Sequence, residues 1–148
     1  MRQTIIVIML MLALPVDADV FVRQDIISRP SVDRFSVCLN HSCETVVTRA
    51  LSRKQWQRVS APLQPAAPTA AAERRAIGRA LAIMEQIVGS QTGTGDDRGG
   101  NLSGFGLPGQ MDCIDESTNA TTYLYLFENA GLLQHHTLED RSTRFGLF

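Results

Sequence analysis

The glycines of this chain are concentrated in one stretch, which limits where regular structure can form. Residues 89–110 hold eight of the 11 glycines in the 148-residue sequence. Glycine loses more conformational freedom on folding than other residues, so helices and strands are not expected at this density. We predict a loop here, either flexible at the surface or ordered against a binding cleft. Asp96, Asp97 and Asn101 within it lack the spacing of an EF-hand loop, so calcium is not expected.

The N-terminus has the features of an export signal. Arg2 precedes an uninterrupted apolar run at residues 5–14, and Val16 and Ala18 are spaced as a signal peptidase prefers. The run is about ten residues long, whereas a membrane span takes about 20. We therefore predict a signal peptide at residues 1–18, followed by a single small exported domain at 19–148, which is periplasmic or secreted.

The charge balance indicates which partners are not expected. The formal net charge is −1, and loss of residues 1–18 leaves it unchanged because Arg2 and Asp17 leave together. Nucleic acids and anionic membranes call for a basic face, so neither is an expected partner. We expect no cofactor. A protein partner that contacts the glycine-rich loop is an open alternative.

A β-hairpin is predicted in the first third of the domain. Residues 34–39 alternate between polar and apolar side chains, and residues 44–51 are rich in β-branched ones. Between them, residues 40–42 (Asn-His-Ser) are typical of a turn. Cys38 and Cys43 flank this turn closely enough to be bridged.

The three cysteines fit an oxidising compartment. There, Cys38 and Cys43 are expected to form a disulfide, which leaves Cys113 as an odd thiol. Cys38, His41 and Cys43 offer an alternative set of zinc or copper ligands. Structural zinc takes four ligands and no fourth is evident, so a metal is not expected.

Three helices are predicted from their caps and apolar spacing. Ser52 and Gln55 form a capping-box pattern that opens a short helix, and a proline-containing linker follows at 62–68. Thr69 is a suitable N-cap for a helix at 70–88, whose apolar stripe comprises Ile77, Leu81, Met84 and Val88.

The third helix is expected at residues 113–130. Asp112 is its predicted N-cap and Gly131 its terminator. The chain ends on an apolar tail at 143–148 that resembles the beginning of a strand.

Cys113 is the strongest candidate for a reactive residue in this sequence. It lies in the first turn of the predicted helix, where unpaired N–H groups and the helix dipole favour a thiolate. The same amides can form part of an oxyanion hole, and Gln110 offers a side-chain donor nearby. Asp115 and Glu116 oppose the thiolate. Alternatively, Cys113 is an inert core residue that shares a helix face with Ser117, Ala120, Leu124 and Phe127.

A nucleophilic cysteine needs a base within hydrogen-bond reach, normally histidine. The predicted helix is about 26 Å long at about 1.5 Å per residue, and five further residues span at most about 18 Å. His135 and His136 therefore cannot reach Cys113 while the helix is intact. His41 escapes this limit, but it lies in a tight turn and is expected to be a polar turn residue. The sequence thus predicts a candidate nucleophile without a convincing base.

Residues 111–124, which begin Met-Asp-Cys-Ile-Asp-Glu-Ser, resemble a family of uncharacterised secreted proteobacterial proteins. Shorter matches bring the likeness to most of residues 35–136. The resemblance implies that longer members continue into a Trp-Pro-His segment and then an Asp near a tryptophan. Cys, His and Asp in that order resemble a papain-like or transglutaminase-like triad. Because this sequence stops before such a His or Asp, we expect a product that is truncated at its C-terminus.

These patterns predict an α+β fold with an N-terminal hairpin and two main helices, which the resemblance implies is the first half of a papain-like fold. The leading functional hypothesis is the N-terminal part of a thiol hydrolase or transferase, with Cys113 as nucleophile and catalytically silent without a base. The alternative is a non-enzymatic periplasmic domain in which Cys113 is buried and the glycine-rich loop contacts a partner.

Overall fold

The structure, a computed structural model, describes residues 23–97 and 107–139. Its elements in chain order are β1 (Phe35–Leu39), β2 (Thr45–Arg49), α1 (Arg53–Ser60), the 3₁₀ helix η1 (Ala61–Leu63), α2 (Ala70–Thr92) and α3 (Cys113–Asn129). The predicted α+β class is therefore confirmed. The predicted signal peptide and the apolar C-terminal tail lie outside the described residues. No helix within them is both long enough and apolar enough to cross a bilayer.

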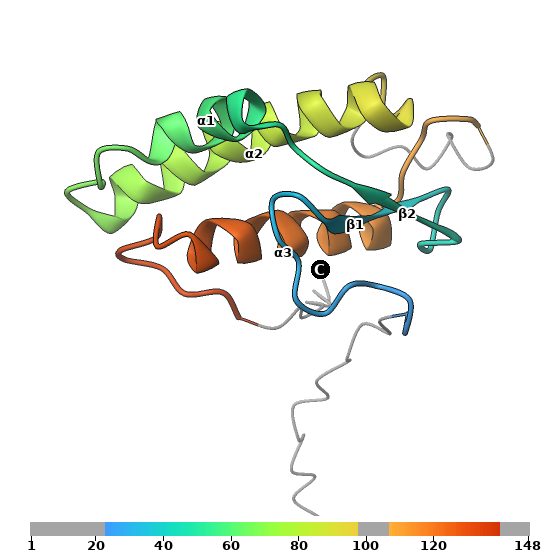
Figure 1. Cartoon of the computed structure of the whole chain (residues 1–148), viewed down its shortest axis with the longest axis horizontal. Helices are drawn as coiled ribbons and strands as arrows, with labels where there is room; N and C mark the ends of the chain where they lie inside the picture. Colours follow the sequence, from blue (N-terminus) through green and yellow to red (C-terminus); the bar gives the residue numbers. More distant parts are fainter. Residues whose placement is uncertain (1–22, 98–106, 140–148) are drawn as a thin grey trace, which may run out of the picture.

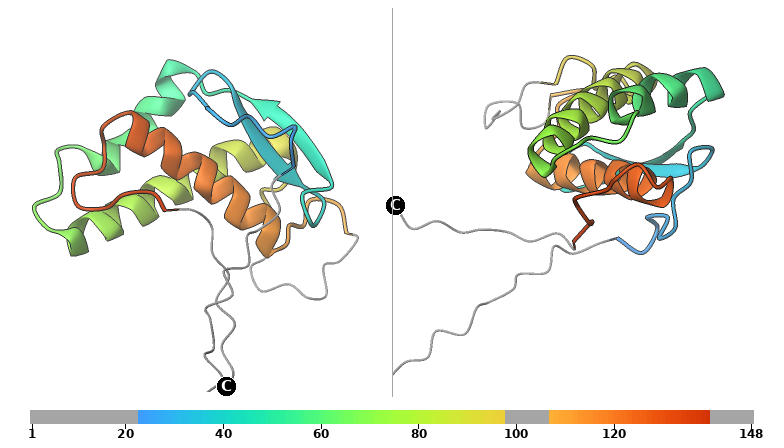
Figure 2. Two further views of the ribbon diagram at one scale, coloured as in Figure 1. Left: turned by 90° about the horizontal axis from the view of Figure 1, so that it is seen from below. Right: turned by 90° about the vertical axis from the view of Figure 1, so that its left-hand side faces the viewer.

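The elements form two layers. The long helix α2 lies above α3 (Figure 1), and the view from below shows that the two helices cross (Figure 2). α1 and η1 pack against α2, while β1 packs against α3. The further views show the hairpin beside α3 and α1 beside α2 (Figure 2). The core between the layers includes Phe35 of β1, Met84 of α2 and Phe127 of α3, each completely or almost completely buried.

The hairpin has the predicted disulfide. β1 and β2 are antiparallel, with Phe35 opposite Arg49 and Leu39 opposite Thr45. Cys38 and Cys43 are joined, as expected. Cys43 lies in the turn rather than on the facing strand, however, and Cys38 is opposite Val46. All five residues of β1 are buried, whereas β2 is partly exposed and forms the outer strand.

The second edge of β1 is covered by a side chain of α3. Partners in an antiparallel pair alternate, so Cys38 directs its backbone groups away from β2. The side-chain amide of Asn119 forms hydrogen bonds with both of these backbone groups. Its Oδ1 accepts from the Cys38 N–H at 2.7 Å, and its Nδ2 donates to the Cys38 carbonyl at 3.0 Å. Asn119 is 1% exposed. It thus does for β1 what a third strand would do.

Helix α2 has the predicted N-cap but is longer than predicted. The Thr69 hydroxyl accepts from the Ala72 N–H, and the helix continues past residue 88 to Thr92. Glycine density suggested a loop from Gly89 onward, which is wrong for Gly89–Thr92. A Cβ on Gly89 would lie 2.9 Å from the Cα of Gly95, so glycine here allows the chain after the helix to fold back against it. The helix ends at Gly93, whose φ is +82°.

The core-facing side of α2 also differs from the predicted stripe. Met84 and Val88 are buried as expected, but Ile77 and Leu81 are only partly buried. The buried positions are Glu73, Ala76, Ala80, Met84, Ile87, Val88 and Gly89. The apolar periodicity missed this face because its first member is a carboxylate and the next two are small alanines.

Helix α3 begins and ends as predicted, but a different face is buried. Asp112 caps its start, and Gly131, at φ +67°, follows its end. The predicted core face began at Cys113, and this is wrong: Cys113 is exposed. The buried residues are Asp115, Thr118, Asn119, Thr122, Tyr123, Leu126 and Phe127. Two polar residues of this face, Asp115 and Asn119, bind the hairpin backbone.

The structure predicts that Asn119 is worth far more to stability than its neighbours. Asn119→Ala leaves the Cys38 N–H and carbonyl buried without partners, so we expect the free energy of unfolding to fall by about 2–4 kcal/mol. Thr121→Ala is the matched control on the same helix, because its hydroxyl only donates to the Ser117 carbonyl. We expect its effect to stay within about 0.5 kcal/mol. Urea unfolding measures both, and equal losses would contradict a special role for Asn119.

Candidate functional site

The hairpin turn is docked onto the N-terminal end of α3. Residues 40–43 all have positive φ angles, between 52° and 67°, which is rare for a run of residues other than glycine. This left-handed turn presents consecutive N–H groups to two carboxylates. His41 and Cys43 each donate to Asp115 at 2.8 Å, and Ser42 donates to Asp112 at 2.8 Å. Successive amides of this kind bind anions, and here the anions are side chains of the same chain.

The pKa values of the two carboxylates of this site are shifted in opposite directions. Burial raises the pKa of Asp115 above its ordinary value, although backbone N–H groups donate to it. Burial also works against ionisation of Asp112, but backbone hydrogen bonds and the charge of His41 outweigh it and lower the pKa of Asp112.

Cys113 is exposed at the first position of α3. The amides expected to favour its thiolate are largely occupied, because the Ile114 and Asp115 N–H groups both donate to Asp112 at 3.0 Å. Two clefts flank α3, and Cys113 lines neither of them. Cys113 is thus an exposed thiol that belongs to neither of these two clefts.

Gln110 precedes α3 and binds the segment that follows α2. Its Nε2 donates to the Asp96 carbonyl at 3.2 Å, while the Met111 N–H donates to the Asp97 carboxylate at 2.9 Å. These bonds tie the two described ends of the glycine-rich segment together. Residues 98–106, including the calcium candidate Asn101, lie outside the described residues.

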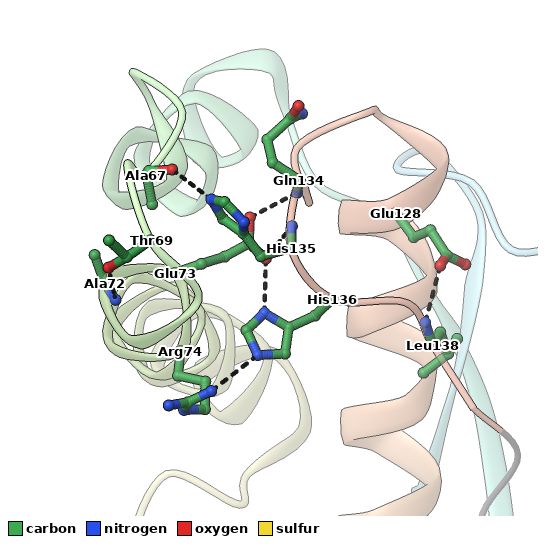
Figure 3. A network of polar contacts seen from close by, with 10 residues as sticks. All are labelled: Ala67, Thr69, Ala72, Glu73, Arg74, Glu128, Gln134, His135, His136 and Leu138. Carbon is green, nitrogen blue, oxygen red and sulfur yellow. Dashed lines mark hydrogen bonds and ion pairs between the residues drawn. The ribbon is translucent and has the colours of Figure 1, made fainter.

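His135 and His136 are fixed at the opposite end of α3 by Glu73. The Glu73 carboxylate accepts from the Gln134 N–H at 2.6 Å and from the His135 N–H at 2.8 Å. The Nδ1 of His136 lies 2.7 Å from the same carboxylate (Figure 3). The His135 ring lies 2.9 Å from the Ala67 carbonyl. Both histidines are therefore held at the start of α2, far along α3 from Cys113.

Glu73 is a buried carboxylate that stays ionised. Its side chain is 1% exposed, and such burial alone would raise its pKa. The hydrogen bonds from Gln134, His136 and His135 outweigh burial and lower the pKa of Glu73 to about 2. In the sequence, Glu73 is one of the residues of the helix predicted at 70–88, and no local pattern reveals its role in fixing the chain after α3.

A third cluster of acids lines a cleft of about 430 Å³ between α2 and α3. It contains Glu85, Asp97 and Glu116, which come from α2, from the segment after it and from α3. Burial, and then the charges of Glu116 and Asp97, raise the pKa of Glu85 to about 7. Sequence reasoning did not bring these three together, because only the packing of α2 on α3 does so.

One group of side chains has the proximity that a metal ion needs. The ligand atoms of Cys38, Cys43 and Asp115 lie within 4.8 Å of one another, and no other such group occurs within residues 23–97 and 107–139. Because its two sulfurs are joined in a disulfide, this group is not a metal site in this form of the protein.

Comparison of the chain with protein-family models, with curated proteins and with solved structures gave no match. The roles assigned to these residues therefore rest on their geometry and chemistry.

The structure predicts that Glu73 stabilises the fold in a pH-dependent way. Glu73→Gln loses ionic hydrogen bonds and turns an NH₂ group toward N–H donors, so we expect a loss of about 2–3 kcal/mol at pH 7. Because the pKa is lower in the folded protein, the stabilisation is present above the ordinary value of 4.5 and is lost as the pH falls toward about 2. The difference between the two proteins in urea unfolding should therefore shrink over that interval.

Glu128→Gln is the matched control for this measurement. Glu128 also accepts a backbone N–H, from Leu138, but it is exposed. We expect a change below about 0.5 kcal/mol, with little dependence on pH. A pH-independent loss in Glu73→Gln would mean that packing, rather than the charge, is what Glu73 contributes.

Proposed function

We propose that this chain is an exported domain with a nucleophilic thiol, resembling the N-terminal part of a papain-like hydrolase or transferase, and that Cys113 is the nucleophile. The observation that carries the proposal is the position of Cys113, exposed at the first residue of α3 with the His41 turn docked on the same helix end. The Cys38–Cys43 disulfide supports export, because disulfides persist in oxidising compartments.

His41 is the base in this proposal. Of the histidines in the described residues, His135 and His136 are held by Glu73 and Ala67 at the other end of α3. The main-chain N–H of His41 binds Asp115, and its ring acts on the pKa of Asp112, the residue before Cys113. The docked turn thus brings an imidazole to the thiol end of the helix, which linear distance along the chain does not indicate.

The position of the thiol sets the class of chemistry. An exposed sulfur outside both clefts suits an acyl or thiol group presented by a large partner better than a small enclosed substrate. Asp112 already occupies the amides of Ile114 and Asp115, so the oxyanion in an acyl transfer would need donors other than these two.

A non-enzymatic role is the second candidate, and Leu107 favours it. Leu107 lies within the glycine-rich stretch at 89–110. It is 57% exposed and is the exposed large hydrophobic residue of the part of the chain that the structure describes. In this role the segment contacts a protein partner, and the exposed Cys113 is chemically ordinary. The exposure of Cys113 excludes the form of this role in which Cys113 is buried.

Alkylation kinetics separate the two candidates. Cys113 is the free thiol of the chain, so iodoacetamide reports on it alone. If His41 assists the thiol, the folded protein should react about tenfold faster at pH 7 than the same chain in urea with its disulfide intact. His41→Asn should return the rate to that of the unfolded reference, and it keeps a residue that tolerates positive φ.

Cys113→Ser is the blank for this experiment, and near-UV circular dichroism checks that the His41 variant is folded. Equal rates in the folded and unfolded chain, with no effect of His41→Asn, would exclude an activated thiol. The interaction role would then be the better account of the domain.

A further inference from the structure

The turn at residues 40–43 has a backbone conformation that its residues do not favour. Asn40, His41, Ser42 and Cys43 all have φ angles between 52° and 67°. In this left-handed region the Cβ of an L-residue lies too close to the following carbonyl oxygen, so residues other than glycine visit it singly and mainly as Asn or Asp. Four such residues in succession persist only where surrounding contacts hold them, and strain of this kind is typical of switch regions.

Two sets of contacts hold the turn, and both include Cys43. Its sulfur is bonded to Cys38, and its N–H donates to the Asp115 carboxylate at 2.8 Å. The His41 N–H donates to the same carboxylate, also at 2.8 Å. Burial raises the pKa of Asp115 although these groups donate to it, so the hydrogen bonds offset only part of the cost of burying its charge. The disulfide therefore supplies the rest of what holds the strained turn.

The two ends of the disulfide are anchored differently. Cys38 belongs to β1, and its backbone N–H and carbonyl are both bound by the side chain of Asn119. Cys43 lies outside both strands, because the ladder closes with the pair of Leu39 and Thr45. Loss of the S–S bond would thus leave Cys38 fixed, while Cys43 could take an ordinary negative φ without breaking any pair of the hairpin. The expected change is confined to the turn.

We propose that the Cys38–Cys43 disulfide is a redox switch, which holds the turn carrying His41 on α3 when it is oxidised and releases that turn when it is reduced. The reductant is a dithiol. Cys43 is the sulfur that it attacks, because Cys43 lies in the turn between two exposed residues, Ser42 and Glu44.

Reduction proceeds by thiol–disulfide exchange in two steps. A thiolate of the dithiol bonds to the sulfur of Cys43, and the electron pair of the S–S bond passes to the sulfur of Cys38, which takes up the proton that the first thiol gave up. The second thiol of the reductant then displaces Cys43 and passes its proton to it. The dithiol leaves as a disulfide, and both cysteines of the protein are thiols.

The switch also regulates the proposed thiol chemistry, and this part of the inference rests on the proposed function. The docked turn brings His41 to the end of α3 that carries Cys113. When the turn is released, the imidazole is no longer held there, and the thiol loses its base. The oxidised disulfide therefore keeps Cys113 reactive, and a dithiol turns this reactivity off.

Release of the turn is tested without the reactive thiol. Cys113→Ser in the full chain leaves the two disulfide cysteines as the only cysteines. Amide hydrogen exchange is followed by NMR before and after addition of dithiothreitol, a dithiol. We expect the His41 and Cys43 N–H groups to exchange at least about tenfold faster in the reduced protein. The dispersed amide shifts of Tyr123 in α3 should be retained, and reoxidation should restore slow exchange in the turn.

The effect on the thiol is tested in Cys38→Ser/Cys43→Ser, in which Cys113 is the only cysteine. Its alkylation by iodoacetamide at pH 7 should be about tenfold slower than in the oxidised wild type and equal to that of His41→Asn. Adding His41→Asn to the double-serine variant should have no further effect, because the histidine has already left the thiol. If the double-serine variant does not fold, peptide mass spectrometry of the reduced wild type measures the same rate at Cys113.

The outcomes for the switch and for the proposed function can be told apart. Unchanged exchange of His41 and Cys43 on reduction would show that Asp115 holds the turn by itself, and would overturn the switch. Loss of the dispersed amide signals of α3 would also overturn it, because the disulfide would then stabilise the whole fold. If the turn opens but Cys113 reacts equally fast in both forms, regulation of the thiol is overturned. An oxidised protein that reacts no faster than the unfolded chain contradicts the proposed function, while faster exchange in the turn still supports the switch.

Discussion

The docking of α3 onto the hairpin is the interaction on which the rest of this structure depends. Asp112, Asp115 and Asn119 lie three and four residues apart, so they share one side of the helix. Asn119 binds the free edge of β1, and the two aspartates bind the left-handed turn that follows it. A two-stranded hairpin is marginal by itself in water. With α3 attached, β1 becomes a buried strand that the core packs against.

Because of this docking, some residues of the segment at 111–117 hold the fold together and others are left at the surface. Met111 packs in the core, Asp112 caps the helix, and Asp115 holds the turn. Cys113 and Glu116, at the intervening positions, are exposed. The most distinctive motif of the sequence is therefore largely structural, and its chemistry belongs to the positions that the fold leaves at the surface.

Local rules predicted the elements well because each signal acts within a few residues. Ser52, Thr69 and Asp112 cap their helices as expected, and the cysteine spacing predicted the disulfide. The same rules failed for the buried face of α3, because apolar periodicity cannot recognise a face built from Asp115 and Asn119. That face is buried only because the hairpin backbone supplies its partners, and those partners lie more than 70 positions earlier in the sequence.

The two ends of α3 are fixed by the same chemistry, and this decides which histidine can act with the thiol. At one end, the carboxylates of α3 accept N–H groups of the turn that carries His41. At the other end, Glu73 of α2 accepts consecutive N–H groups of the segment that carries His135 and His136. These two sets of hydrogen bonds lie at opposite ends of a helix of 17 residues. Such a helix is about 25 Å long at about 1.5 Å per residue. Among the described residues, a thiol–imidazole pair at Cys113 therefore has to use His41, and its formation depends on Asp115 keeping the turn in place.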